Sequence, residues 1–185
     1  MGFFSRKPTT SYTNTRHAHF IIYNGGYYDG EVDSHNHYHG YGEQHGGDGW
    51  IYKGEWKNGR KHGKGLETGP KGQRYSGEFF EGSFIRGEAT DERGNRYEGD
   101  FPNWCGSCSR FGHLKIIYTD GSVYEGDVYE YMQVRHGKGT MIYPNGDRYV
   151  GDWYRFKRQG KGVMYYADGS VYKGKWINDE PAKKS

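Results

Sequence analysis

Tyr52-Lys53-Gly54-Glu55-Trp56, followed by His62-Gly63-Lys64-Gly65, is the segment that best indicates the fold of this chain. Alternate side chains of an extended strand point to opposite faces, so the tyrosine, glycine and tryptophan share one face and the lysine and glutamate the other. Between the two stretches lies the polar loop Lys57-Asn58-Gly59-Arg60-Lys61, whose glycine can adopt the positive φ that turns require. This segment therefore predicts a β-hairpin with one aromatic face and one charged face.

The same motif, Tyr-x-Gly-x-(Trp, Phe or Val), recurs along the chain at a nearly constant spacing. Successive tyrosines of the motif are 24, 23, 22, 27, 25 and 23 residues apart. A fixed period of this length is typical of repeat proteins, and the turn dipeptides Asp120-Gly121, Asn145-Gly146 and Asp168-Gly169 end the later return strands. The pattern predicts an array of hairpins that follow one another as an antiparallel meander. Its seven copies are Tyr28–Val32, Tyr52–Trp56, Tyr75–Phe79, Tyr97–Phe101, Tyr124–Val128, Tyr149–Trp153 and Tyr172–Trp176.

The composition sets the kind of core that the chain can build. Of the 185 residues only 32% are hydrophobic, yet 18% are aromatic and 32 are glycine. Disordered chains are poor in aromatic residues, so we expect a folded protein with a thin aromatic core in place of a large aliphatic one. No apolar stretch approaches the length of a membrane-spanning helix. Two cysteines three positions apart do not form a disulfide framework, which favours a reducing compartment.

The repeated residues resemble the MORN repeat, whose pattern is Tyr-x-Gly-x-Trp, a glycine-containing loop, His-Gly-x-Gly and a glycine turn. The resemblance covers residues 20–178 and departs from the pattern at Arg86-Gly87-Glu88-Ala89 and Phe111-Gly112-His113-Leu114. It implies an all-β fold, an elongated and twisted antiparallel meander of hairpins in a single-layer sheet. We therefore divide the chain into a basic N-terminal tail (1–19), a repeat array (20–178) and a C-terminal tail (179–185).

A two-stranded hairpin is only marginally stable, so each repeat has to pack against its neighbours. We expect the rings to stack along one face, over bare glycine backbone, and to form a groove for a helix or an extended segment of a partner protein. A sheet of this kind has two open ends, so an end strand is expected to pair with a second copy or with a partner. The predicted partner-binding residues are Tyr52, Trp56, Tyr75, Phe79, Tyr97, Phe101, Tyr149, Trp153, Tyr172 and Trp176.

The resemblance implies cytoskeletal, ciliary or flagellar, and membrane-junction roles. We favour a scaffold in a cytoskeletal assembly of the cytoplasm such as the axoneme, where radial spokes are one home of the family. No Ser/His/Asp or Cys/His set is spaced for nucleophilic catalysis, so we expect a protein that is not an enzyme and needs no cofactor. The net charge of +3 comes from the tails, and without a concentrated basic face we expect no nucleic-acid binding.

Charged residues recur on the other face of the repeats. Lys64, Lys138 and Lys161 occupy the same place in three repeats, and an acid follows most of the motif tyrosines by three residues. The first interpretation is a solvated ladder of charge pairs across strands. The alternative is a surface for an anionic partner, in particular a phosphoinositide-binding membrane tether helped by Arg6 and Lys7 in the tail.

Two further motifs suggest redox or metal chemistry. Trp104-Cys105-Gly106-Ser107-Cys108 is similar to the active-site motif of thioredoxin-like proteins, but it lacks the helix that activates such a cysteine, so we expect an exposed loop. Cys105, Cys108 and His113 offer three zinc ligands where a structural site needs four. The histidines at 35, 37 and 39 alternate, with His45 near, and can bind a transition metal. For them too we expect a polar loop, and we predict no metal site.

Overall fold

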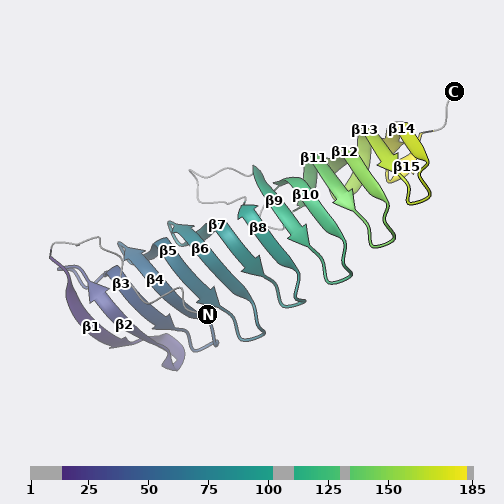
Figure 1. Cartoon of the computed structure of the whole chain (residues 1–185). Coiled ribbons are helices and arrows are strands. Elements are labelled where there is room, and N and C mark those ends of the chain that lie inside the picture. The colour runs from purple at the N-terminus through teal and green to yellow at the C-terminus, as the bar shows by residue number, and fades with distance from the viewer. Residues whose placement is uncertain (1–13, 102–110, 130–133, 183–185) are drawn as a thin grey trace. The chain divides into compact units, whose positions relative to one another are not determined.

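The computed structural model describes residues 14–101, 111–129 and 134–182, which form antiparallel strands and one short 3-10 turn, η1 (Tyr23–Gly25). The order of the strands in the sheet is their order in the chain, β1 to β15 (Figure 1). This arrangement confirms the predicted all-β antiparallel meander. None of the described residues belongs to a helix with the length and apolar character needed to span a bilayer.

The chain divides into two compact units, Met1–Phe84 and Ile85–Ser185, with β7 (Ser83–Thr90) at the boundary. The first unit contains β1 (Arg16–Ile21), β2 (Tyr27–Val32), β3 (Tyr38–His45), β4 (Ile51–Lys57), β5 (Arg60–Thr68) and β6 (Arg74–Phe80). The second contains β8 (Arg96–Asp100), β9 (Phe111–Ile117), β10 (Val123–Tyr129), β11 (Val134–Ile142), β12 (Arg148–Tyr154), β13 (Lys157–Tyr165), β14 (Val171–Ile177) and β15 (Glu180–Pro181).

The loop between β4 and β5 is shorter than the sequence suggested. Between β4 and β5 only Asn58 and Gly59 connect the strands, with φ of 51° and 77°. Two successive left-handed residues are typical of the type I′ turn, whose twist matches that of the flanking strands. Lys57 and Arg60 are already paired across the ladder. The predicted five-residue loop is therefore wrong, and its second half belongs to the return strand.

Facing glycines mark the middle of the hairpins. Gly54 lies opposite Gly65 in the first unit, and Gly151 lies opposite Gly162 in the second. Immediately after each pair the register shifts, between Gly54 and Trp56 and again between Gly151 and Trp153. Such a bulge bends the strand and increases its twist. The hairpins β2–β3, β4–β5, β10–β11 and β12–β13 thus share a bare backbone patch at the centre and a bulge beside it.

Each unit has its own hydrophobic core, which consists mainly of motif residues. The core of the first unit contains Ala18, Tyr28, Val32, Tyr52, Trp56 and Phe79. The core of the second unit contains Leu114, Ile116, Tyr124, Val128, Met141, Tyr149, Trp153, Met164 and Trp176. The sheet begins upstream of the predicted array, at Arg16, and its last strand ends at Pro181. Residues 1–13 and 183–185 of the predicted tails lie outside the described residues.

Candidate functional site

The aromatic face is built from tyrosines that lie on glycine. A Cβ added to Gly162 would come within 2.6 Å of the Tyr149 Cζ, so no side chain fits between that ring and the strand. The Tyr149 Oη donates a hydrogen bond to the backbone oxygen of Asp152 at 2.9 Å. The predicted contact between ring and bare glycine backbone is confirmed. The same phenol-to-carbonyl bond is made by Tyr28, Tyr52, Tyr124 and Tyr172.

The rings contact one another edge to face. The centroids of Tyr149 and Trp153 are 5.2 Å apart with an interplanar angle of 87°, and Tyr149 makes a second contact of this kind with Trp176. In the first unit Tyr52 lies in the same way between Trp56 and Phe79. The prediction that these rings stack is wrong for these pairs. An edge-to-face pair places the positive ring edge against the negative ring face, which makes the row cohesive.

The structure divides the ten predicted partner-binding residues into two groups. The buried group consists of Tyr52, Trp56, Phe79, Tyr149, Trp153 and Trp176, which are at most 4% exposed. The half-buried group consists of Tyr75, Tyr97, Phe101 and Tyr172. Rings of the first group hold the sheet together beneath the surface. A protein docked on the aromatic face would therefore meet the second group and the side chains around it.

Basic side chains cover the buried rings, and the sequence analysis did not foresee them. The Arg158 guanidinium lies 4.5 Å from the centroid of Trp176, and Arg135 lies 5.0 Å from that of Trp153. In the first unit the Lys61 Nζ lies 5.1 Å from the Tyr52 centroid. Cations at these distances are attracted to the ring face. A signal was present, because a base directly precedes His-Gly-Lys-Gly or Gln-Gly-Lys-Gly in all three places.

The first unit holds a groove of about 650 Å³ on this face. Besides Tyr23 and the buried Tyr52, the rings Trp50, Tyr75 and Phe84 line it. The centroids of Trp50 and Tyr75 are 6.2 Å apart, and those of Tyr75 and Phe84 are 5.6 Å apart. Tyr23, which is 90% exposed, stands at the rim. Polar lining comes from Asp48, Gln44 and the ion pair of Lys61 with Glu67.

Trp50 lines the groove but lies outside the repeated motif, so the motif did not predict it. It stands two positions before the motif tyrosine Tyr52. The corresponding residues of the other repeats are small or polar: Gly26, Gln73, Asn95, Ser122, Asp147 and Ser170. A large ring at this one position makes the first unit different from a uniform array. Comparing the repeats position by position could have found it.

On the charged face the acids bind backbone as well as lysine side chains. The Asp152 Oδ2 accepts a hydrogen bond from the backbone N–H of Lys161 at 2.8 Å, across the bulge. Asp127 binds the N–H of Lys138 in the same way at 2.9 Å. The predicted side-chain pair across strands is present between Lys138 and Asp152. Lys161 instead faces Lys175, so like charges are opposed there.

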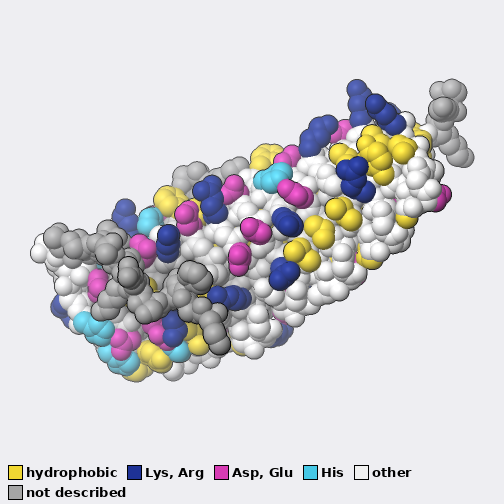
Figure 2. Space-filling model, viewed as in Figure 1, with side chains coloured by type: hydrophobic (Ala, Val, Ile, Leu, Met, Phe, Trp, Pro, Cys, Tyr) yellow, Lys and Arg dark blue, Asp and Glu magenta, His cyan; other side chains and the backbone are white. Residues whose placement is uncertain are grey.

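The three lysines predicted for an anionic partner are exposed. Lys64, Lys138 and Lys161 all lie on the charged face. Figure 2 shows acidic and basic side chains interspersed on the face it presents. Mixed charges give a weaker field than a continuous basic patch.

Burial and neighbouring charges fix the protonation of two groups in the repeat. Burial, and then the nearby Asp152 carboxylate, raises the pKa of Tyr149 to about 12, so its hydroxyl stays a donor at neutral pH. Partial burial opposes ionisation of Asp152, but hydrogen bonds from the Lys138 side chain and the Lys161 backbone lower the pKa of this carboxyl. The carboxylate therefore stays charged and holds the bulge.

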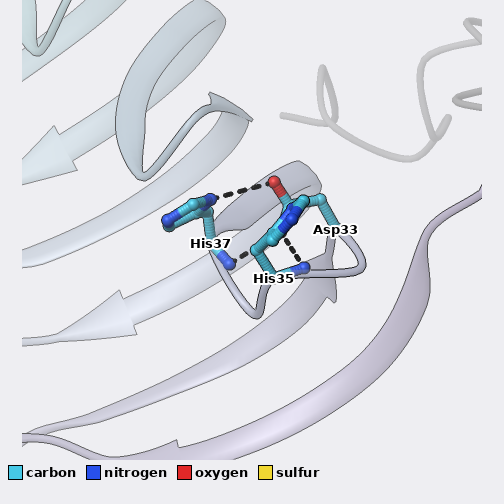
Figure 3. Close-up of side chains that lie close together, drawn as sticks. All are labelled: Asp33, His35 and His37. Atoms are coloured by element: carbon cyan, nitrogen blue, oxygen red, sulfur yellow. Dashed lines mark hydrogen bonds and ion pairs between the residues drawn. The ribbon is translucent and has the colours of Figure 1, made fainter.

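A second cluster lies in the loop between β2 and β3. Asp33, His35 and His37 each offer one metal-ligating atom, and these atoms lie within 4.8 Å of one another (Figure 3). The prediction that these histidines lie in a polar loop is confirmed for His35 and His37, whereas His39 belongs to β3. Partial burial works against ionisation of Asp33, but hydrogen bonds from His37 and His35 lower the pKa of its carboxyl.

The predicted redox motif, with Cys105 and Cys108, lies outside the described residues. His113, the third residue of the possible zinc set, is described. Its Nδ1 lies 3.2 Å from the Asp127 Oδ1, and its side chain is 60% exposed.

Comparison with known proteins places the repeats in a family. Three segments, residues 52–74, 134–148 and 149–171, match the MORN repeat, which agrees with the resemblance seen in the sequence. Among solved structures, the SAS-4 (dCPAP) TCP domain of Drosophila melanogaster, in complex with a proline-rich motif of Ana2, is 11% identical with a TM-score of 0.42. The match covers 95% of this chain and 99% of that one.

A second structure, the TCP10 domain of Danio rerio CPAP in complex with a STIL peptide, is 9% identical with a TM-score of 0.27. It covers 86% of this chain and 84% of that one. Both TM-scores are below 0.5, so neither likeness says anything about the function of this chain.

Proposed function

Because this chain is a MORN-repeat protein, we propose that it is a non-enzymatic scaffold whose aromatic face holds a segment of a partner protein. The groove of the first unit carries the proposal. It joins three rings that are not fully buried, Trp50, Tyr75 and Phe84, on a face where the other motif rings of the first unit are buried. Rigid aromatic side chains lose little conformational entropy on binding and are enriched among residues that dominate binding energy.

The lining of the groove defines the kind of segment that it would hold. The rings provide apolar lining, and Asp48 and the Lys61–Glu67 ion pair provide polar lining. A segment that presents both apolar and polar side chains matches this mixed lining. A helix or an extended strand can present such a face.

We propose a second contact at an end of the sheet. β1 is the first strand in the sheet order, and a terminal strand offers backbone donors and acceptors for another strand. The partner there would be a second copy or another protein. Sedimentation of the purified chain over a range of concentrations would reveal the copy, and a monomer throughout would contradict self-pairing.

For the cellular setting we propose a cytoskeletal assembly such as the ciliary or flagellar axoneme, with radial spokes as one example. The support is the family resemblance. A tagged chain should remain with the cytoskeleton after detergent extraction and, in ciliated cells, should label the axoneme. Complete release by detergent would contradict this setting.

The groove can be tested by photo-crosslinking from the full chain. A crosslinking amino acid in place of Tyr23 should capture a partner, while one in place of Tyr154, which is 52% exposed in the second unit, should not capture it. With that partner purified, Trp50→Ala should weaken binding about tenfold or more. Equal capture from both positions, or unchanged affinity of the variant, would contradict the groove as the binding site.

A second candidate function is a tether to anionic, phosphoinositide-containing membranes. The observation that favours it is the pair Lys161 and Lys175, because like charges in register are tolerated more easily with a counter-anion. Binding to anionic vesicles should fall steeply with salt and be reduced by Lys161→Glu.

Replacing Cys105 and Cys108 with serine tests the redox alternative, since partner binding should survive the change.

A further inference from the structure

The loop between β2 and β3 is longer than the other loops that the structure describes inside a repeat. It has five residues, Asp33 to His37, whereas two residues connect the strands at 58–59, 81–82, 155–156 and 178–179. The longer loop contains both histidines of the cluster. Histidine side chains also gather at the β1–β3 end of the first unit in Figure 2.

The Asp33 carboxylate is held in a fixed position within this loop. Its Oδ1 accepts hydrogen bonds from the backbone N–H groups of His35 at 2.8 Å and His37 at 2.9 Å. The loop is also closed by a backbone bond from the Asp33 N–H to the His37 oxygen at 3.0 Å. These bonds use one carboxylate oxygen and no imidazole. The second oxygen and the two rings are therefore not needed to close the loop.

These remaining groups are arranged as metal ligands are. The Asp33 Oδ2 lies 3.0 Å from the His37 Nδ1, and the two histidine rings are 5.9 Å apart (Figure 3). Ligand atoms bound at about 2.0–2.2 Å in a tetrahedral site lie roughly 3.3–3.6 Å apart, so the Asp33 and His37 atoms need to separate only slightly to share an ion. His35 and His37 are exposed, which gives an ion access and leaves positions for water.

The ligand types select the class of ion. Imidazole nitrogen suits Zn²⁺, Cu²⁺ and Ni²⁺, whereas Mg²⁺ and Ca²⁺ prefer oxygen ligands. We propose that the loop binds one divalent transition-metal ion of the Zn²⁺ class through a carboxylate oxygen of Asp33 and one ring nitrogen each of His35 and His37. The site is independent of the proposed partner groove, since none of its three ligands lines that groove.

The test uses calorimetric titration of the full chain with ZnCl₂ and, as the oxygen-preferring control, MgCl₂. A Cys105→Ser, Cys108→Ser background removes thiols that would compete for zinc. One zinc should bind per chain and magnesium should not. His35→Ala and His37→Ala should each weaken zinc binding about tenfold or more. Asp33→Asn should also weaken it, although the amide oxygen can still accept the two backbone hydrogen bonds.

His113→Ala is the matched control, because His113 is an exposed histidine beside an aspartate without a second histidine in the cluster. Its affinity for zinc should equal that of the background protein. In NMR spectra zinc should shift the ring signals assigned to His35 and His37 before those of His113. Three results would overturn the site: no zinc binding by folded protein at roughly millimolar concentration, unchanged affinity in the His35→Ala, His37→Ala double variant, or equal weakening by His113→Ala.

Discussion

The contact between Tyr149 and Gly162 gives a prediction whose size follows from the structure. In Gly162→Ala the new Cβ would lie 2.5 Å from the Tyr149 Cε2 and 2.6 Å from its Cζ, where ordinary contacts are near 3.4–4 Å. The ring is 0% exposed and is held between Trp153 and Trp176. It therefore has no free space to move into, and its displacement would disturb both ring contacts.

The expected cost is the sum of a few opposing contributions. Overpacking costs about 1–3 kcal/mol, and a weakened edge-to-face contact adds about 0.5–1.5 kcal/mol. Loss of the hydrogen bond from the Tyr149 hydroxyl adds about 1 kcal/mol. Alanine also makes the unfolded chain stiffer than glycine does, which offsets about 0.4–1 kcal/mol. We expect Gly162→Ala to lower the free energy of unfolding by about 2–4 kcal/mol.

Urea unfolding followed by tryptophan fluorescence measures this loss, and a double-mutant cycle identifies its cause. Tyr149→Leu keeps apolar bulk near the backbone but lacks the outer ring atoms that meet the new Cβ. In that background Gly162→Ala should cost much less, with a coupling of about 1–3 kcal/mol. Gly169→Ala separates strain from collision: it adds backbone strain at φ +87° with no atom within 4 Å of its Cβ position, whereas Gly162 has no such φ. Additive effects in the cycle would refute the argument.

Three further predictions concern the same repeat. Arg158→Met keeps an unbranched apolar side chain but removes the charge over Trp176 and the hydrogen bond to the Asp179 backbone oxygen at 2.7 Å. It should lower the free energy of unfolding, measured by thermal unfolding, by about 1–2 kcal/mol. The pKa of Asp152 is lowered in the fold, so its charge stabilises the protein above the ordinary pKa near 4 and this stability is lost as pH falls through the lower value. Wild type should therefore exceed Asp152→Asn in urea midpoint at pH 7, and a gap of unchanged size in strong acid would contradict this. In urea unfolding, Trp153→Phe should lower the free energy of unfolding by about 1 kcal/mol more than Trp176→Phe does. The reason is that Trp153 Nε1 donates a hydrogen bond to the Gly139 oxygen, whereas the buried Trp176 Nε1 has no hydrogen-bond partner among the described residues. Equal losses in the two variants would contradict this prediction.

The fold could be predicted because its two main requirements are visible in residue types. Alternation places Tyr149, Gly151 and Trp153 on one face. The tyrosine ring can lie on the strands only because Gly151 and the facing Gly162 lack a Cβ. A 23-residue step repeats both conditions along the chain. No contact between distant parts of the sequence is needed, since each hairpin packs on the next.

The cations over the rings could not be predicted, because their position depends on the length of a turn. Lys57 to Lys61 reads as a polar loop, but the type I′ turn uses only Asn58 and Gly59. Lys61 therefore lies within β5, directly opposite Trp56. Alternation alone does not reveal how many residues a turn takes, and a difference of three residues moves a base from solvent onto the aromatic core.

The hydrogen bonds from backbone N–H groups to the acidic side chains could not be predicted from the sequence either, because they depend on the bulge. Strict alternation pairs Asp152 with a lysine side chain, and the contact with Lys138 follows this rule. The bond from the Lys161 N–H to Asp152 exists because the register shifts after Gly151 and turns that N–H toward the carboxylate. Gly160, at φ +90°, lies beneath the same carboxylate, where any Cβ would collide with it. The acid and the glycine therefore recur together as parts of one bulge.

The burial of the motif residues also bears on where specificity for a partner resides. Tyr52 and Trp56 are required to build a hairpin, and at 2% and 3% exposure they offer almost no surface. A partner can distinguish one repeat from another only through residues that the motif leaves variable. Trp50 is such a residue. The equivalent Gln73 and Asn95 accept backbone hydrogen bonds in the loops, whereas the tryptophan ring provides contact surface in the groove. Positions outside the motif are therefore where the binding surface of one array can differ from that of another with the same fold.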